Sequence, residues 1–559
     1  MRTKLRIFGF LFVILVCGLI ARLFFWQVID ASNLAQQGQL QYQRSDSLTA
    51  TRGSIYATDG SYLTTDEMDW DLYVTKPDLT ENSITIASQI APIINADIND
   101  IRNKIDSGTA WISLQHRVTN DQKKNIEALD IAGVGFDPEP SRTYPESSSS
   151  AHILGFVGKD VNGNDKGYFG LEGYYDLTLA GKPGLLDRES DANGTPIVFG
   201  NSSQVDPTHG IDLVTNIDKT VQFAIEKELA NGLVQYGSKA GSVIMMDPNT
   251  GAILGMASSP SFDPGQYWNY TNEDFKDAAI SNTFEPGSIF KPIVMASALD
   301  AGVVQPDTEC DICANIINVD GYPIDTWDSV HHPNSSMTDV IVNSDNIGMT
   351  FVGQKLGQDK LYDYLAKFGF GKITGIDLQG EVALPLRTKD TWSDIDTATT
   401  TFGQGIAVTP IQILRAIGII ANGGQMVKPE VVKEIKNGTW SSEIKSQIGP
   451  RVISQNAAGE ITDMMVHAVT DGEAKWAAPA GFSIAGKTGT AQIPVSGHYD
   501  PTKTIASFVG FAPAKNPKFV MLVTLQSPTS SEWGSETAAP LWFHIAEDLF
   551  PYFGISPNN

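Results

Sequence analysis

The most prominent feature of the hydrophobic pattern is an apolar run near the N-terminus. It covers residues 7–21 and resumes after Arg22 with Leu-Phe-Phe-Trp. At about 1.5 Å of rise per residue, a helix of this length crosses the hydrocarbon core of a bilayer. Arg2, Lys4 and Arg6 precede the run, which predicts a cytoplasmic N-terminus and an exported remainder. Because no clear small-x-small cleavage site follows, an uncleaved anchor is favoured over a signal peptide.

After the anchor, the pattern changes to shorter elements. Residues 27–50 are polar and rich in Gln and Ser, which is typical of a short helix or linker. Residues 51–56 followed by Asp-Gly at 59–60 predict a strand and a hairpin turn. Helix-like runs and polar breaks alternate over residues 80–135. From residue 243, two apolar runs flank Pro-Asn-Thr-Gly, which predicts a second hairpin at the start of a second domain.

Composition and charge exclude some classes of function. The chain has 559 residues, of which 42% are hydrophobic, and a formal net charge of −25. That length exceeds what one compact core usually organises. Binding nucleic acid needs clustered cations to neutralise phosphates, and no Lys- or Arg-rich stretch stands out beyond the extreme N-terminus. We therefore expect two large folded domains with an anchor, and no nucleic-acid partner.

The candidate chemistry begins with Glu-Pro-Gly-Ser-Ile-Phe-Lys-Pro at residues 285–292. A serine three residues before a lysine on one helical turn places the Lys291 amine where it can take the proton of the Ser288 hydroxyl. This pair of residues is common by chance, and the chain has a second copy at Ser442 and Lys445. The second copy lacks the Pro-Gly entry and lies in a polar stretch, so Ser288 is the favoured nucleophile.

Two further motifs follow in order, Ser344-Asp345-Asn346 and Lys487-Thr488-Gly489-Thr490. Ser344 can relay a proton to a departing amine, and Asn346 offers an amide that can hold Lys291 or a substrate carbonyl. The ammonium group and hydroxyls of the last motif suit an anionic carboxylate, and its glycine leaves room for a peptide against a strand edge. The predicted catalytic residues are Ser288, Lys291, Ser344, Asn346 and Lys487, and the predicted substrate-binding residues are Thr488, Gly489 and Thr490.

The three motifs, in this order in an exported domain, resemble those of penicillin-binding proteins and class A β-lactamases. The chain as a whole resembles a class B penicillin-binding protein of the division-type branch, a monofunctional peptidoglycan D,D-transpeptidase. The resemblance implies an α+β protein with an antiparallel catalytic sheet flanked by helices. Its expected parts are a cytoplasmic stub and transmembrane anchor (1–30), a linker (31–50), a mixed, dimerisation-like, non-catalytic pedestal (51–235) and a β-lactamase-like transpeptidase domain (236–559).

Motifs outside the active site carry part of the resemblance. They are Arg52-Gly53-Ser54-Ile55, Arg142-Thr143-Tyr144-Pro145 with Ala151-His152, Gly170-Leu171-Glu172, Gly403-Gln404-Gly405, and residues 507–513. We interpret the N-terminal motifs as structural: turns, a buried ion pair and packing between domains. Ser147 stands where the family usually has glycine.

The resemblance implies acyl transfer on a stem peptide that ends in D-Ala-D-Ala. Ser288 attacks the penultimate carbonyl with Lys291 as general base, and Ser344 helps to protonate the departing D-alanine. An amine of a neighbouring stem then takes the acyl group. By family analogy, the backbone N–H groups of Ser288 and Thr490 form the oxyanion hole. No metal and no organic cofactor is implied.

The expected location is the cell membrane, with a single pass, a cytoplasmic N-terminus and an extracytoplasmic catalytic domain. The partners implied by the resemblance are peptidoglycan stem peptides, covalently bound β-lactams, a membrane glycan polymerase of the SEDS type and divisome proteins. The division-type motifs favour a role in septation.

Three alternatives stay open at this point. A β-lactam sensor would need further transmembrane helices or a cytoplasmic effector, and a scaffolding pseudo-enzyme is disfavoured by the intact motifs. A β-lactamase would need a deacylating carboxylate, which the sequence neither locates nor excludes.

The Cys310-x-x-Cys313 pair lacks the remaining ligands of a zinc site, and an exported setting favours a disulfide that clips a surface loop.

Overall fold

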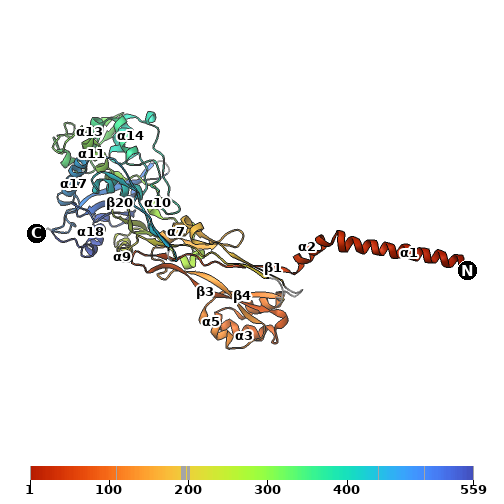
Figure 1. Cartoon of the computed structure of the whole chain (residues 1–559). Helices are drawn as coiled ribbons and strands as arrows, with labels where there is room; N and C mark the ends of the chain where they lie inside the picture. The colour runs from red at the N-terminus through yellow and green to blue at the C-terminus, as the bar shows by residue number, and fades with distance from the viewer. Residues whose placement is uncertain are drawn as a thin grey trace. The chain divides into compact units, whose positions relative to one another are not determined.

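The computed structural model describes residues 2–108, 110–189, 197, 202–438, 440–495 and 498–557. They form two compact units, of which the first comprises Met1–Arg52 and Ala180–Gly210 and the second Gly53–Leu179 and Ile211–Asn559 (Figure 1). The boundaries expected from the sequence, at residues 30, 50 and 235, stay a prediction.

The first unit contains the apolar N-terminal helix. Helix α1 (Arg2–Phe24) continues into a π-helical turn (Phe25–Ile29), and most of its side chains are exposed. In the described ranges this is the one helix long and apolar enough to cross a membrane. The guanidinium of Arg22 lies 4.8 Å from the centre of the Trp26 ring, a cation–π contact at one end of the apolar run. The helix fits a single-pass membrane protein.

The polar stretch after the anchor forms both a helix and a strand. Helix α2 (Ala31–Tyr42) is followed by β1 (Gln43–Leu48). β1 pairs antiparallel with β8 (Gly184–Glu189), which pairs with β9 (Ser202–Val205), so three strands complete the first unit.

The N-terminal part of the second unit is built on a seven-stranded sheet, with the order β17-β16-β10-β2-β3-β4 and β5 paired to β3. The strands are β2 (Ile55–Tyr56), β3 (Tyr62–Thr75), β4 (Trp111–Val118), β5 (Val134–Thr143), β10 (Asp212–Thr215), β16 (Val432–Asn437) and β17 (Trp440–Glu443). β2 and β3 pair antiparallel around the Asp-Gly turn, as predicted. β16 and β17 come from the catalytic half of the chain, so long-range pairing completes this sheet.

Three helices cover part of this sheet. α3 (Ser83–Ile94), α4 (Ile98–Ser107) and α5 (Asn120–Glu127) pack with β3 and β4 around a core of their own, and α3 and α5 lie beside these strands in Figure 1. The helix-like pattern over residues 80–135 therefore corresponds to all three helices. The strand β4, which lies between α4 and α5, was not predicted. Ile112 and Leu114 alternate toward the core in this strand, a period-two pattern too short to stand out in the sequence.

The predicted buried ion pair is present in this part. The Arg142 guanidinium donates from Nε to Glu172 Oε1 at 2.7 Å and from Nη1 to Asp66 Oδ1 at 2.9 Å. The Arg142 side chain is 5% exposed and that of Glu172 is fully buried. Ser147 has a φ of +51°, so the backbone keeps the left-handed conformation that a glycine would favour.

The catalytic sheet has five antiparallel strands in the order β12-β11-β21-β20-β19. They are β11 (Ala240–Met246), β12 (Ile253–Ser259), β19 (Ala485–Val495), β20 (His498–Ala512) and β21 (Phe519–Gln526). Alternate residues enter different cores: Val243 and Met245 pack toward α9 (Lys219–Tyr236) and α18 (Ala538–Leu549), and Ile244 and Met246 pack into the core on the opposite face. This confirms the expected antiparallel sheet with helices on both faces.

The helices of the opposite face carry the site. They are α11 (Lys291–Asp300), α12 (Met337–Val342), α13 (Asn346–Leu356), α14 (Gln358–Lys367), α15 (Asp394–Thr401), α16 (Pro410–Ala421) and α17 (Gln455–Thr470). Shorter elements complete the second unit: α6 (Ala151–Leu154), β6 (Phe156–Lys159), β7 (Asp165–Tyr168), α7 (Gly170–Tyr174), α8 (Asp176–Leu179), α10 (Ala278–Ser281), β13 (Ile317–Val319), β14 (Tyr322–Ile324), β15 (Gln425–Val427) and β18 (Ile448–Arg451).

Cys310 and Cys313 form a disulfide. The favoured interpretation of the pair is therefore confirmed, but its expected place at the surface is wrong. Both residues are fully buried within the large core cluster of the catalytic half.

Candidate active site

The candidate nucleophile lies at the start of a long buried helix. Residues Gly287–Phe290 form one 3-10 turn that leads into α11. Ser288 is partly exposed while Lys291, one turn later, is fully buried. The backbones of Gly287 and Gly403 lie so close together that a β-carbon on Gly403 would be 2.2 Å from the carbonyl oxygen of Gly287. The Gly403-Gln404-Gly405 motif therefore packs directly against the turn that carries Ser288.

The Ser-Asp-Asn motif is the loop between α12 and α13. Ser344 has a φ of +54°, a conformation that costs a non-glycine residue about 1 kcal/mol. Asp345 caps α13 by accepting from the N–H groups of Ile347 and Gly348 at 2.7 and 3.0 Å. The turned backbone directs the Ser344 carbonyl oxygen and the Asn346 side chain toward Lys291.

The Lys291 amine is surrounded by three oxygen atoms. Its Nζ donates to the Ser344 carbonyl oxygen at 2.5 Å and to Asn346 Oδ1 at 2.8 Å, and lies 3.3 Å from Ser344 Oγ. The amide orientation is fixed, because Asn346 Nδ2 donates to the Asp325 carbonyl oxygen at 3.0 Å. The first two oxygens only accept, so they use both protons of an –NH₂ group and leave its lone pair for a hydroxyl proton.

Burial and the nearby Lys487 ammonium lower the pKa of Lys291 to about 7. Taking a cation out of water disfavours its charged form, and a second cation adds to that effect. A lysine with such a pKa is neutral in a large fraction of molecules at physiological pH. It can therefore act as a general base.

The Lys-Thr-Gly motif lies on β19, the edge strand of the catalytic sheet, as the resemblance implied. Lys487 Nζ donates to Thr488 Oγ1 at 3.0 Å, and both side chains are buried. Thr490 Oγ1 accepts from the Gly534 N–H at 2.9 Å. The structure thus brings the predicted residues of all three motifs together: Lys291 contacts Ser344 and Asn346, and the turn that carries Ser288 packs against β19.

Gly489 has a reason other than the one inferred from the sequence. A β-carbon there would lie 2.6 Å from Ser507 Oγ and 2.8 Å from Ile289 Cγ2. The space on this side of the strand is filled by the protein itself. The glycine lets the nucleophile's turn pack directly on β19.

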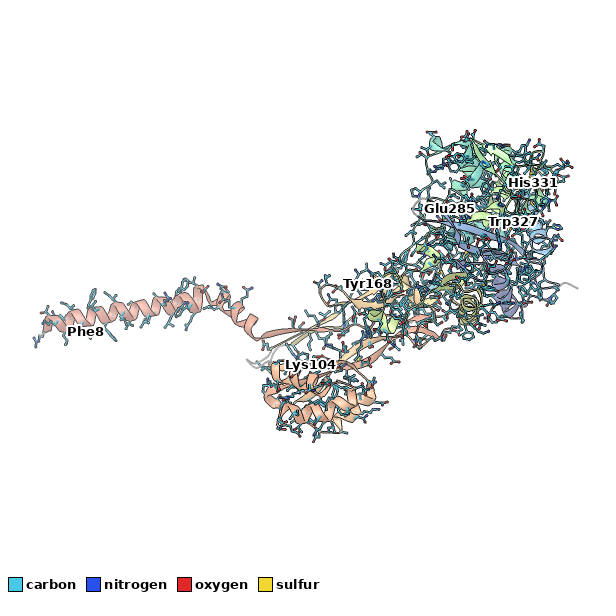
Figure 2. All side chains as sticks on the ribbon, turned by 180° about the vertical axis from the view of Figure 1, so that it is seen from behind. Phe8, Lys104, Tyr168, Glu285, Trp327 and His331 are labelled. Atoms are coloured by element: carbon cyan, nitrogen blue, oxygen red, sulfur yellow. A yellow bond between two sulfur atoms is a disulfide. The ribbon has the colours of Figure 1, made fainter. Side chains whose placement is uncertain are left out.

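Three further residues belong to the site and were missed. Glu473 Oε2 accepts from Thr488 Oγ1 at 2.8 Å. Trp327 Nε1 donates to the Asn343 carbonyl oxygen at 3.2 Å, and its ring lies 5.1 Å from that of Trp533. Trp327 lies with His331 and Glu285 in the same part of the catalytic half (Figure 2). Glu473 follows the end of α17 in an ordinary polar turn, and no spacing signal in the sequence connects it with Lys487.

The second Ser-x-x-Lys copy has a different structure. Ser442 lies on the exposed strand β17, where it pairs with Ile435. The strand ends at Glu443 and Lys445 lies beyond it, so this serine and lysine do not share a helical turn as Ser288 and Lys291 do. Among the residues that the structure describes, no three His, Cys, Asp or Glu side chains are grouped as a metal site.

Comparisons with known proteins identify the family of the chain. A family model described as the penicillin-binding protein transpeptidase domain matches residues 241–549, and one described as the penicillin-binding protein dimerisation domain matches residues 47–215. The chain is 32% identical to stage V sporulation protein D of Bacillus subtilis, over 99% of this chain and 86% of that protein.

Two further relatives extend the comparison. The chain is 28% identical to peptidoglycan D,D-transpeptidase FtsI of Escherichia coli, over 97% of this chain and 92% of that protein. The crystal structure of penicillin-binding protein 2X from Streptococcus thermophilus superposes with a TM-score of 0.78 at 22% identity, covering 92% of this chain and 80% of that chain, and shows the same fold.

The fold and the paired domains define a serine enzyme that transfers acyl groups in cell-wall synthesis. The chain belongs to the class B penicillin-binding proteins, and it is a serine-type peptidoglycan D,D-transpeptidase. The family acts on peptidoglycan and interacts with β-lactams.

Proposed function

We propose that Ser288 is the nucleophile of this transpeptidase and that Lys291 is its general base. The observation that carries the proposal is the environment of the Lys291 amine, which is fully buried and held by two oxygens that can only accept. Its lone pair can take the Ser288 proton as the serine oxygen bonds to the penultimate D-Ala carbonyl carbon. The C–N bond to the terminal D-alanine then breaks.

The other motif residues complete the proposed reaction. Ser344 Oγ lies 3.3 Å from Lys291 Nζ, so it can pass the proton on to the nitrogen of the departing D-alanine. Lys487 and Thr490 hold the carboxylate of the substrate. An amine from a neighbouring stem then attacks the acyl-serine carbonyl carbon, returns a proton through Lys291 and releases Ser288.

We propose further that β-lactams acylate Ser288, because they present the same reacting carbonyl beside a carboxylate. The test is a fluorescent-penicillin gel with wild type, Ser288→Ala and Ser442→Ala. We expect loss of labelling for Ser288→Ala and full labelling for Ser442→Ala. Peptide mapping of the labelled wild type identifies the acylated residue. Labelling that persists in Ser288→Ala, or that follows Ser442, contradicts the assignment.

The proposed cellular role is cross-linking at the division septum, on the basis of the division-type motifs and the likeness to FtsI. Sporulation is the second candidate, because the relative at 32% identity is named as a sporulation protein. Depletion during vegetative growth separates the two. Filaments without septa support the septal role, and normal growth with defective spores supports the second.

In the proposed topology the three cations before α1 stay in the cytoplasm and the catalytic half is outside. The pedestal, over residues 51–235, then holds the transpeptidase domain away from the membrane. A membrane glycan polymerase of the SEDS type and divisome proteins are the proposed partners, since the chain's two matched domains are a dimerisation domain and a transpeptidase domain.

A further inference from the structure

A directed chain of hydrogen bonds lies behind the Lys-Thr-Gly strand. Lys487 Nζ donates to Thr488 Oγ1 at 3.0 Å, and Thr488 Oγ1 donates to Glu473 Oε2 at 2.8 Å. An ammonium group can only donate and a carboxylate can only accept. The single hydroxyl proton of Thr488 is therefore committed to Glu473, and its oxygen receives a proton from Lys487.

The two threonine hydroxyls of the motif consequently differ. Thr488 has no proton left to offer a substrate carboxylate. Thr490 Oγ1 accepts from the Gly534 N–H at 2.9 Å, so its own proton remains available to donate. The sequence had assigned both hydroxyls to substrate binding. The hydrogen bonds instead make Thr488 a link between a lysine and a carboxylate.

The charged groups around the two lysines come from separate elements. Lys291 begins α11 and Lys487 lies on β19, while Glu473 follows α17 and Asp345 caps α13. Asp345 is engaged by the N–H groups of its own helix. Farther out, beyond Asn346, His331 Nε2 lies 2.9 Å from Asp325 Oδ1, and His467 pairs with Asp471 on the exposed end of α17. Glu473 is thus the carboxylate that is hydrogen-bonded into the lysine pair.

We propose that Glu473 is a positioning residue of this active site, which anchors Lys487 through the Thr488 hydroxyl and helps to keep that lysine charged. The carboxylate, one hydroxyl away, favours the ammonium form of Lys487, whose charge adds to the effect of burial in favouring a neutral Lys291 amine. The inference rests on the proposed roles of Ser288, Lys291 and Lys487. It adds a residue that the motifs do not contain.

The pH profile of acylation tests this role. Lys291 must be neutral to act as a base, which sets the acidic limb, and Lys487 must be charged to hold a carboxylate, which sets the alkaline limb. Burial lowers the pKa of each lysine. The Glu473 carboxylate opposes both shifts, and the Asp345 carboxylate also opposes that of Lys291. Removing that charge in Glu473→Gln therefore moves both limbs toward acidic pH. The glutamine oxygen can still accept from Thr488.

The experiment measures the second-order rate constant for acylation by a fluorescent penicillin, with the full-length protein in detergent, between about pH 5 and pH 10. We expect the rate of Glu473→Gln to fall about tenfold at the alkaline end relative to wild type and to rise on the acidic limb. Asp471→Asn is the matched control. It removes the same charge two residues away, from a side chain that is 60% exposed and pairs with His467, and its limbs should stay in place.

The outcomes separate the inference from the function on which it rests. If Ser288 is acylated in wild type but the limbs of Glu473→Gln stay in place, or only the height of the profile falls, the inference is overturned and the proposed function stands. If wild type is not acylated at Ser288, both fail. Should Glu473→Gln not fold, Glu473→Asp decides: it keeps the charge, so the limbs stay at their wild-type pH values while the rate changes, and displaced limbs overturn the inference.

Discussion

Lys291 is held by atoms from both ends of the Ser-Asp-Asn loop. The strained φ of Ser344 turns its carbonyl oxygen toward the amine, and the Asp325 carbonyl oxygen fixes the rotation of the Asn346 amide. A buried lysine costs free energy unless its polar atoms are satisfied. These contacts satisfy the protons of the amine, and burial together with the Lys487 charge lowers its pKa.

At the same scale, Gly489 is predicted to be a packing requirement of the nucleophile's turn. A methyl group at Gly489 would collide with Ile289 and Ser507, and overpacking of this kind costs about 1–3 kcal/mol. We expect Gly489→Ala to lower both the free energy of unfolding and the rate of penicillin acylation. Urea unfolding and a labelling time course measure the two effects.

Gly459→Ala is the control for that substitution. Gly459 lies inside α17 and has open space where a β-carbon would be. Alanine has the better helix propensity, so this variant should keep or gain stability and acylate at the wild-type rate. Equal behaviour of the two variants would show that packing at Gly489 is unimportant.

At the scale of elements, the pairing of β3 with β5 places like charges opposite each other. Asp69 faces Glu139 and Asp71 faces Asp137 in the antiparallel register. Directly opposed like charges destabilise a strand pair. The strands nevertheless pair because alternate residues, such as Leu72 and Val74, are fully buried in the core beneath α3. Burial of the hydrophobic face therefore sets the register, although this register places like charges opposite each other.

This register predicts a pH dependence of stability with a defined sign. Burial raises the pKa of Asp71, and the carboxylates of Glu139 and Asp137 add to that shift. The stability linked to this proton is complete below the ordinary aspartate range and is lost as pH rises through the raised pKa. Asp71→Asn should therefore gain stability relative to wild type as pH rises, measured by urea unfolding between about pH 3 and pH 7.

Asp59, in the turn between β2 and β3, provides a comparison of opposite sign. The Ser61 hydroxyl donates to it at 2.6 Å and lowers the pKa of its carboxyl. Stability linked to this group is present above the ordinary range and is lost as pH falls. Asp59→Asn should lose stability relative to wild type as pH rises. Slopes of the same sign for the two variants would contradict this account.

At the scale of the whole molecule, the catalytic half and the N-terminal part of the second unit are joined by more than the chain. The Phe156 ring stacks on the rings of Tyr168 and Tyr267 and packs against Phe275 in one aromatic cluster. The Tyr175 hydroxyl donates to Asp377 Oδ2 at 3.0 Å. With β16 and β17 in the pedestal sheet, these contacts favour movement of the two parts as one body.

The matched domains predict a division of labour in cell-wall synthesis. The dimerisation and transpeptidase domains match residues 47–215 and 241–549, and neither description includes glycan polymerisation. We expect the full-length protein, reconstituted with lipid-linked precursor, to make no glycan and no cross-links alone, and to cross-link strands once a membrane polymerase is added. A Ser288→Ala control should abolish the cross-links but leave the glycan. Glycan made by this protein alone would contradict the prediction.

The sequence by itself determined the apolar N-terminal helix, the two hairpins and the order of the three motifs, and it favoured Ser288 over Ser442 as the proposed nucleophile. These features depend on residues that are close together in the sequence. The periods of a helix and a strand fix where such residues lie relative to one another. The Pro-Gly entry before Ser288 and the Asp-Gly turn after β2 are local signals of this kind.

Only the tertiary structure decided how Glu473, Asp325 and Trp327 enter the site, why residue 489 is glycine, and where β16 and β17 pair. Each of these depends on segments far apart in the chain meeting after folding. Glu473 stands in a polar turn, and nothing in that turn distinguishes its carboxylate from the other acidic side chains of the molecule. Its contact with Thr488 exists because α17 packs against both α11 and β19, and the close packing of that core sets which polar groups meet.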